Sequence, residues 1–239
     1  MRPLSARSVI LSVLLGAHPP EAPVAELITF AEAFGIQPTT TRVALTRMVA
    51  AGDLDRTDTT YRLTPRLLAR QQHQDRMLSA TVEEPWDRTW RTVIVVSSGD
   101  PAPARAALRT SLRDHRFAEL REGVWIRPHN IDLDWRPADN PRVETLTATP
   151  DTDPHHLAQR LFDLTTWAET ATTLITAMDH TPAPMARLTI AAAIVRHLLT
   201  DPLMPTELVP DTWPAAHLRA TYANYRHELA DLRNSLLQT

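Results

Sequence analysis

The chain has 239 residues, of which 43% are hydrophobic and 22% charged, and a net charge of −3. This composition is that of an ordinary globular protein of one to three domains. It has no cysteine, which excludes disulfides and cysteine-ligated zinc or iron–sulfur sites, and no apolar run approaches the ~20 residues that span a bilayer, so we expect a cytoplasmic protein without a membrane segment.

The charge is distributed unevenly. All 25 basic residues are arginine. Residues 1–79 carry a net charge of +2, residues 80–150 carry −1 and residues 151–239 carry −4. An overall negative charge argues against strong non-specific binding to nucleic acid. Any contact with DNA is therefore expected in the first segment.

Two helices are predicted at the start of the chain. Ser5 can cap a helix that runs to Gly16. After a proline-rich loop, a second helix from about Val24 carries apolar residues at helical spacing and ends at Gly35.

A third helix follows, with Pro38 at the first helical position and Leu45, Met48 and Val49 on one buried stripe. The residues outside the stripe are Thr39, Thr40, Arg42, Val43, Thr46 and Arg47. Arginine can bind guanine edges in the DNA major groove, and threonine can donate a hydrogen bond or pack on a thymine methyl group. The alternative is an ordinary amphipathic helix with a solvated polar face.

A β-hairpin is predicted after Gly52, because apolar residues alternate on both sides of a polar tip up to Leu63. Its arginines, Arg56 and Arg62, are candidates for contacts with DNA. Three helices followed by a hairpin are typical of a winged helix-turn-helix, which favours a DNA-reading role for the third helix.

A polar helix from Arg66 to about Thr81 is predicted to connect this region to a small α/β domain. The β-branched run Trp90–Val96 indicates a central strand, and Pro101 and Pro103 open a helix. A hairpin and an edge strand, Val143–Thr147, complete the order of elements. This order predicts a ferredoxin-like domain with a reduced second helix.

The helix of that domain carries a stripe of arginines, which are Arg105, Arg109, Arg113 and Arg116. A phosphate-binding surface is one interpretation. A solvated face paired with nearby acids, at Asp114, Glu119 and Glu122, is the favoured one.

The remainder of the chain is predicted to be helical, over His155–Met178, Pro184–Leu199 and Ala215–Leu237. The predicted fold class is therefore α+β with several domains. The predicted limits are 1–66 for the winged helix-turn-helix, 67–84 for the connector, 85–150 for the central domain and 151–239 for the helical domain.

Six motifs occur in order along nearly the whole chain. They are Ser5-Ala-Arg-Ser-Val-Ile, Gly35-Ile with Arg42-Val-Ala-Leu-Thr-Arg-Met, Tyr61-Arg-Leu-Thr-Pro65, Trp86-Asp with Trp90, Gly123-Val-Trp-Ile with Pro128, and Asp201-Pro-Leu-Met-Pro-Thr-Glu-Leu-Val-Pro with Trp213-Pro214. Together they resemble the PaaX family of bacterial transcriptional repressors of phenylacetate catabolism.

The resemblance implies an N-terminal winged helix, a central domain similar to CRISPR-associated ferredoxin-like nucleases and a C-terminal helical domain. It also implies homodimers on palindromic double-stranded DNA operators, released by an aryl-CoA thioester. Asp55 and Asp58 flank Arg56, which argues against strong contacts between the hairpin and phosphate. The effector need not be phenylacetyl-CoA, so an acyl- or aryl-CoA is expected.

Candidate ligand-binding residues lie in the last third of the chain. Arg187 and Arg196 share one helix and could hold phosphates, while Trp167, Trp213 and Tyr222 could line an apolar slot. Core packing explains the aromatic residues equally well.

No catalytic residue, cofactor or metal site is predicted. The nuclease relatives hold a metal with an aspartate at the end of the first strand, whereas this chain has Ser97 and Ser98 there and its first acid is Asp100. His155 and His156 lack a third ligand at supporting spacing. We therefore expect a regulator and not an enzyme. The alternatives are a protein-interaction module that retains a winged-helix scaffold and, less favoured, a metal-dependent nuclease.

Overall fold

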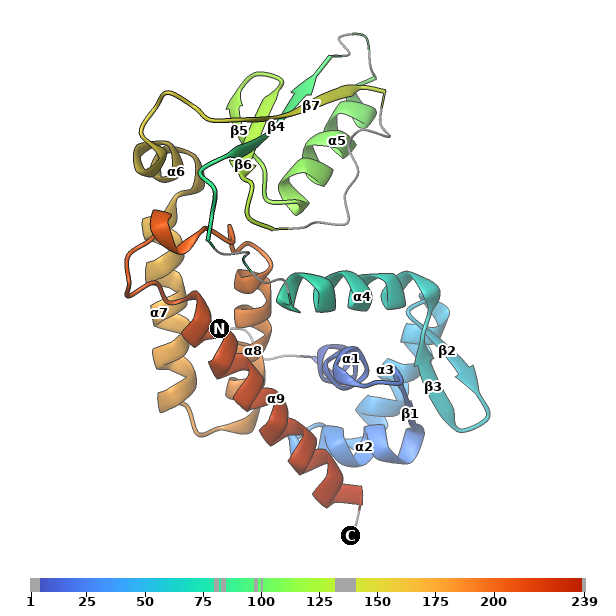
Figure 1. The fold of residues 1–239 in the computed structure, drawn as a ribbon. Coiled ribbons are helices and arrows are strands. Elements are labelled where there is room, and N and C mark those ends of the chain that lie inside the picture. The colour runs from blue at the N-terminus through green and yellow to red at the C-terminus, as the bar shows by residue number, and fades with distance from the viewer. Residues whose placement is uncertain are drawn as a thin grey trace. The chain divides into compact units, whose positions relative to one another are not determined.

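Three helices and a small sheet form the N-terminal part of the protein. The computed structural model describes residues 5–79, 82, 85–96, 99, 101–131 and 141–237. In chain order the N-terminal elements are α1 (Ala6–Gly16), β1 (Glu21–Pro23), α2 (Val24–Ala33), α3 (Pro38–Ala50), β2 (Leu54–Thr57) and β3 (Thr60–Leu63). The three helices and the hairpin expected from the sequence are present (Figure 1).

The strand β1 was not predicted. It pairs antiparallel with β3, so the sheet order is β1-β3-β2. β1 has only three residues and ends in Pro23, which leaves no alternation to recognise in the sequence. Its effect is to attach the start of α2 to the hairpin.

The chain divides into two compact units, and each unit combines segments that are distant in the sequence. The first unit contains residues 1–79, 172–199 and 216–239, and the second contains residues 80–171 and 200–215. Segments from the last third of the chain therefore belong with the N-terminal elements. The four domain limits given above remain a prediction.

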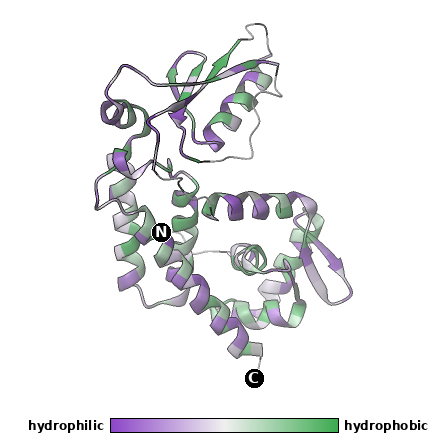
Figure 2. Ribbon diagram, viewed as in Figure 1, coloured by the Kyte–Doolittle hydropathy of each residue, from purple (hydrophilic) through white to green (hydrophobic). Residues whose placement is uncertain are grey.

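The core of the first unit begins where α1, α2 and α3 pack on one another. Each helix contributes side chains that are almost fully buried, among them Val9, Ile10, Leu14, Leu27, Phe30, Leu45 and Met48. The hairpin covers one side of this core, and its strands are mostly hydrophilic (Figure 2).

The first unit is completed by α4 (Pro65–Ser79), most of α7 (Leu164–His180), α8 (Pro184–Leu198) and α9 (Ala215–Leu237). Buried Gln71 joins α4 to the end of α1, because its amide donates to the carbonyls of Leu15, 2.8 Å away, and Ala17, 3.1 Å away. These carbonyls have no partner within their own helix, so Gln71 acts as a cap supplied from a distance.

The second unit is built on a four-stranded antiparallel sheet. Its elements are β4 (Trp90–Val95), α5 (Ala102–Asp114), β5 (Ala118–Arg121), β6 (Val124–Pro128) and β7 (Val143–Ala148). The strand order is β5-β6-β4-β7. The predictions that β4 is a central strand and β7 an edge strand are confirmed.

Both faces of this sheet are covered. Successive side chains of a strand point to opposite sides, so each strand contributes to both faces. Val93 and Trp125 face Leu112 of α5 and Phe117. On the other face, Trp90 and Ile126 pack with a cluster from α6 (Pro154–Phe162), α7 and the 3-10 helix η2 (Thr206–Leu208).

The single helix predicted over residues 155–178 is wrong. Asp163 adopts a left-handed backbone with φ of 43° and separates α6 from α7. Aspartate tolerates this conformation better than most residues. Apolar residues keep helical spacing on both sides of Asp163, so the hydrophobic pattern does not mark the break. No helix in the described part of the chain is long and apolar enough to cross a membrane.

Candidate functional site

The start of α3 is fixed by a tight turn at the end of α2. Gly35 has a φ of 76°, a left-handed conformation that glycine adopts without strain. Its amide donates to the carbonyl of Glu32, and the amide of Ile36 donates to that of Ala31, 3.0 Å away. This pair of bonds is a Schellman motif. Pro38 then begins α3, while Gln37 makes no side-chain cap bond.

The end of α3 is closed by a second Schellman motif. Gly52 has a φ of 68°, and its amide donates to the carbonyl of Val49 over 3.0 Å. The amide of Asp53 donates to the carbonyl of Met48 over 2.9 Å. The C-terminal end of α3 is therefore closed by backbone hydrogen bonds, while the first Schellman motif closes α2 just before α3 begins.

The buried stripe of α3 differs from the predicted one at one residue. It consists of Thr41, Leu45 and Met48, whereas Val49 is 37% exposed. Thr41 fits the interior because its hydroxyl donates to the carbonyl of Gln37, 3.4 Å away. The spacing of four and three residues from Thr41 turns Val49 away from the core.

The six residues predicted to face outward from α3 are all exposed: Thr39, Thr40, Arg42, Val43, Thr46 and Arg47. The Thr46 hydroxyl donates to the carbonyl of Arg42, 3.1 Å away. In the part of the chain that the structure describes, no carboxylate pairs with Arg42 or Arg47. This face therefore offers two free cations between hydroxyl and methyl groups.

A hollow of about 580 Å³ lies between this face and the start of α1. It is lined by Ser5 and Arg7 from the first helix region and by Thr39, Val43 and Arg47 from α3, among others. Ser5 caps α1, because its hydroxyl oxygen accepts from the amide of Ser8. The positive end of a helix thus borders the exposed face of α3.

The arginines of the hairpin are exposed but already have partners. Arg56 donates from Nε to the carbonyl of Asp58, 2.9 Å away, and its guanidinium lies 5.8 Å from the ring centroid of Tyr61. Arg62 lies opposite Asp55 in the strand register and approaches the Thr57 hydroxyl at 3.5 Å. The hairpin therefore presents its cations less freely than α3 does.

Asp53 ties α3 to two other helices. Its carboxylate, only 3% exposed as a residue, accepts from Arg7 of α1 at 2.8 Å and from Arg66 of α4 at 2.5 Å. Burial raises the pKa of Asp53, but hydrogen bonds from the two arginines and their charges outweigh it, so the pKa is lowered overall. This role was not predicted, since Asp53 stands only at the edge of the predicted hairpin.

The five predicted ligand residues do not share one site. Arg187 donates to the carbonyl of Met178 over 3.0 Å, pairs with Glu228 and lies 5.6 Å from the Tyr225 ring centroid. Trp213 belongs to the second unit, where it stacks on a second aromatic ring, that of Trp167, at 4.9 Å. Arg196, in contrast, lines a cavity.

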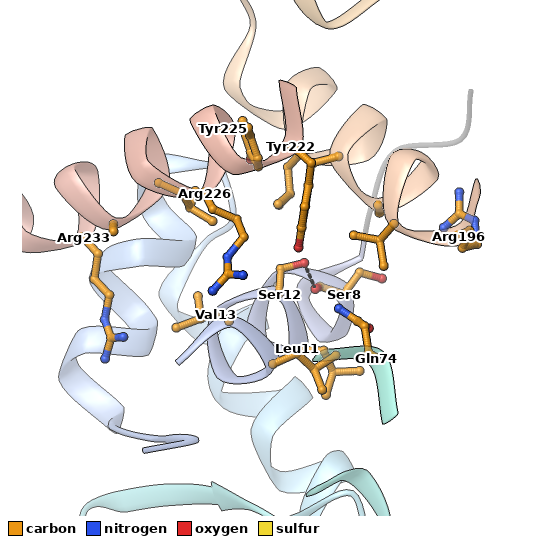
Figure 3. A pocket seen from close by; sticks show the side chains of 18 of the residues that line it. Ser8, Leu11, Ser12, Val13, Gln74, Arg196, Tyr222, Tyr225, Arg226 and Arg233 are labelled. Carbon is orange, nitrogen blue, oxygen red and sulfur yellow. Dashed lines mark hydrogen bonds between the residues drawn. The ribbon is translucent and has the colours of Figure 1, made fainter. Parts of the chain in front are cut away.

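That cavity has a volume of about 340 Å³ and lies within the first unit, between α1, α4, α8 and α9 (Figure 3). Tyr222 also lines it, so a second residue that the sequence analysis considered for a ligand slot is found there. The other lining residues extend from Arg7 to Arg233, more than 200 positions apart in the chain, and only the fold reveals their association.

The arginine stripe of α5 is engaged within the second unit. Arg109 pairs with Glu119 at 3.4 Å, and Arg113 lies 5.5 Å from the ring centroid of Trp125. Pairing with Glu119 agrees with the favoured interpretation. Ser97, Ser98 and Asp100, on which the nuclease alternative depended, lie outside the described residues.

A fully buried arginine in the second unit was not anticipated. Arg127 donates to the side chain of Asn130, 3.0 Å away, and to the carbonyls of Pro128 and His115. Burial, together with the nearby charges of Arg116 and Arg91, lowers the pKa of Arg127 to about 9. Its bonds connect the sheet to residues of the same unit, which indicates a structural role.

Among the described residues, no group of three histidine, aspartate, glutamate or cysteine side chains is arranged to hold a metal ion. His155 and His156 are exposed at the start of α6.

Comparisons with known proteins cover most of the chain. Three family models match: "PaaX-like protein" over residues 5–67, "PaaX protein central Cas2-like domain" over residues 83–142 and "PaaX-like protein C-terminal domain" over residues 158–239. Among solved structures, the uncharacterised protein Rv0674 from Mycobacterium tuberculosis is similar, with 49% sequence identity and a TM-score of 0.85. The match covers 98% of this chain and 99% of that one. No match was found among curated proteins.

Proposed function

Because the chain belongs to the PaaX-like family, we propose that it is a transcriptional regulator that binds double-stranded DNA through α3. In this proposal α1 to β3 form a winged helix-turn-helix, α3 is the recognition helix, and the protein represses the genes next to its operator. The central domain is ferredoxin-like, in keeping with the β5-β6-β4-β7 order, and serves no catalytic function.

The observation that carries the proposal is the outward face of α3. Arg42 and Arg47 are exposed, have no carboxylate partner in the described chain, and stand among threonine side chains on a helix whose C-terminal end is closed by a Schellman motif. A rigid helix with free guanidinium groups suits the major groove, where arginine binds guanine at two atoms. The start of α1, which borders the same hollow, suits a backbone phosphate.

The hairpin acts as the wing in this proposal, with a minor share of the contacts. Arg56 and Arg62 are exposed near its tip but are held by Asp58, Tyr61 and Thr57. They would approach phosphate only by giving up these contacts. We therefore assign most of the sequence preference to α3.

We further propose that the protein acts as a homodimer on a palindromic operator. The segment that contains α3 has a net charge of only +2, so one copy has little electrostatic affinity for DNA. Two copies related by two-fold symmetry engage two half-sites together. The central and C-terminal parts supply the contact between copies, because the acidic C-terminal segment is repelled by DNA.

An acyl- or aryl-CoA thioester is the proposed effector that releases the operator. Family resemblance is the main support, and the arginines of α8 are further support. Arg196 is exposed and borders a cavity, whereas Arg187 is already paired and Trp213 is stacked on Trp167. Among Arg187, Arg196 and Trp213, Arg196 therefore keeps the strongest case.

Selection of bound duplexes from a random pool tests the proposal. We expect an enriched palindrome whose affinity falls steeply as salt is raised, since protein contacts release counterions from phosphate. The mass of the complex, measured by light scattering, should correspond to two chains. Equal affinity for selected and random DNA at moderate salt would contradict the proposal.

A protein-interaction module is the competing function. Val43 is 50% exposed and Val49 is 37% exposed on α3, which gives its outer face an apolar share. On DNA, Val43 would pack on a thymine methyl group. Affinity that does not change across the salt titration would favour the protein-interaction alternative.

A further inference from the structure

The cavity in the first unit combines an apolar lining with an excess of cations. Its apolar surface comes from leucine, valine and alanine side chains of α1, α8 and α9, such as Leu11, Leu188 and Leu229. Among the described residues that line it, five are arginines, which are Arg7, Arg70, Arg196, Arg226 and Arg233, and none is acidic. Its volume of about 340 Å³ lies within the range of small-molecule sites.

Two of these arginines have carboxylate partners outside the cavity lining. Arg7 binds Asp53, and Arg233 binds Glu26. Within the described part of the chain, no carboxylate pairs with Arg70, Arg196 or Arg226. Three cations therefore remain for an anion that enters the cavity.

The cavity lining also includes the hydroxyl of Tyr222, a polar group that can donate to an anion. Figure 3 shows Tyr222 and Arg226 pointing from α9 towards α1, where Ser8 and Ser12 lie. Burial raises the pKa of Tyr222, so its hydroxyl stays protonated and able to donate. Charge-assisted hydrogen bonds from arginine are stronger than neutral ones.

From this arrangement we infer that the cavity binds an organic anion with an apolar body, such as a carboxylate or a phosphate monoester, and that occupancy weakens the support of α3. The regulatory part rests on the proposed function. Arg7 is the link, because it lines both this cavity and the hollow beside α3. An anion that attracts Arg7 competes with Asp53, which holds the end of α3.

This cavity differs from the site that the sequence suggested. Arg196 and Tyr222 belong to it, while Arg187 and Trp213 do not line it. A CoA thioester is larger than the cavity, so only its acyl end and the adjoining polar groups would lie inside. A free acid, a phosphate monoester and a CoA thioester all combine an apolar chain with negative charge, and binding experiments can distinguish among them.

Calorimetric titration of the full-length protein with eight-carbon probes tests the inference. The probes are octanoate, octyl phosphate and octanoyl-CoA, with octanamide and CoA as controls that lack the charge or the apolar body. At least one anion should bind about tenfold more tightly than octanamide. The probe that binds most tightly identifies the chemical class of the ligand.

Two matched pairs of variants locate the site. Arg226→Gln should weaken binding of the anion about tenfold, whereas Arg160→Gln, an exposed arginine on α6, should leave it unchanged. Ala230→Trp should block the cavity, whereas Ala223→Trp, also exposed on α9 but outside the lining, should not. Absence of binding by every anion, or equal loss in each variant and its control, would overturn the inference.

The regulatory part is tested with the selected duplex. The bound anion should weaken operator binding about tenfold, and the operator should weaken anion binding by the same factor, because coupling is reciprocal. Anion binding by a protein that prefers no duplex would refute the proposed function but leave the cavity assignment standing. Operator binding without anion binding would refute the cavity assignment alone. Unchanged operator affinity in the presence of bound anion would refute the coupling.

Discussion

Helices α3 and α5 both carry arginines on one side, but their surroundings differ. On α3, Arg42 and Arg47 point outward with no carboxylate partner in the described chain. On α5, Arg109 binds Glu119, and Arg113 lies over the Trp125 ring. The partners on α5 come from the hairpin that directly follows it. An arginine stripe therefore indicates an anion-binding surface only where the neighbouring elements leave its charges free.

The largest expected effect concerns the support of α3. Asp53→Ala should lower the free energy of unfolding by about 2–3 kcal/mol, because it leaves two arginines without their buried acceptor. Asp55→Ala, on the exposed side of β2, should cost under about 0.5 kcal/mol. Denaturant unfolding of both variants measures the difference. Equal costs would mean that Asp53 does not hold α3.

Loss of a free arginine on α3 should affect recognition rather than stability. Arg47→Ala should remove about 1–3 kcal/mol of discrimination at one base pair in each half-site, if Arg47 binds guanine. Arg113→Ala on α5 is the control and should leave discrimination unchanged. Competition with single-base variants of the selected duplex is the measurement. A uniform loss across all sequences would assign Arg47 to phosphate instead.

The Asp53 cluster should also make stability depend on pH. Because its pKa is lowered in the folded protein, the unfolded chain binds this proton at higher pH. The contribution of Asp53 is therefore complete above about pH 4 and is lost as the pH falls through the folded pKa. The difference in unfolding free energy between wild type and Asp53→Asn should shrink on acidification. A difference that stays constant down to pH 3 would contradict this account.

The smallest effect is expected for the paired arginine of α5. Arg109→Ala should lower the unfolding free energy by no more than about 0.5 kcal/mol, because its bond with Glu119 lies at the surface. It should not alter DNA affinity. A loss of affinity comparable to that of Arg47→Ala would show that both stripes bind phosphate and would remove the distinction between the two helices.

The outward face of α3 was predictable because exposure on a helix follows its 3.6-residue period. Val49 was misplaced because a valine next to Met48 fits the buried stripe by type, whereas Thr41 becomes an interior residue only through its bond to Gln37. The local sequence pattern thus predicted the outward face of α3. It did not predict that Thr41 is buried, because the Thr41 hydroxyl forms its hydrogen bond within the helix.

Other features depend on partners that are distant in the chain. The bond between Asp53 and Arg7 joins residues 46 positions apart, and Gln71 caps carbonyls more than 50 positions away. The cavity joins α1 to α9, so no local spacing marks it. The turn at Asp163 is also hidden, because its left-handed backbone interrupts an otherwise continuous apolar repeat.

The composition of the first unit from distant segments has a consequence for synthesis of the chain. Arg233 of α9 pairs with Glu26 of α2, a separation of 207 residues, and both helices belong to the first unit. During translation the N-terminal elements leave the ribosome long before α9 exists. Until α9 is synthesised, the surface of α1 that later lines the cavity stays exposed to water. Contacts of such long range close slowly, because a long loop must be ordered before they form. The N-terminal elements that include α3 are therefore synthesised well before α8 and α9, which complete the same unit.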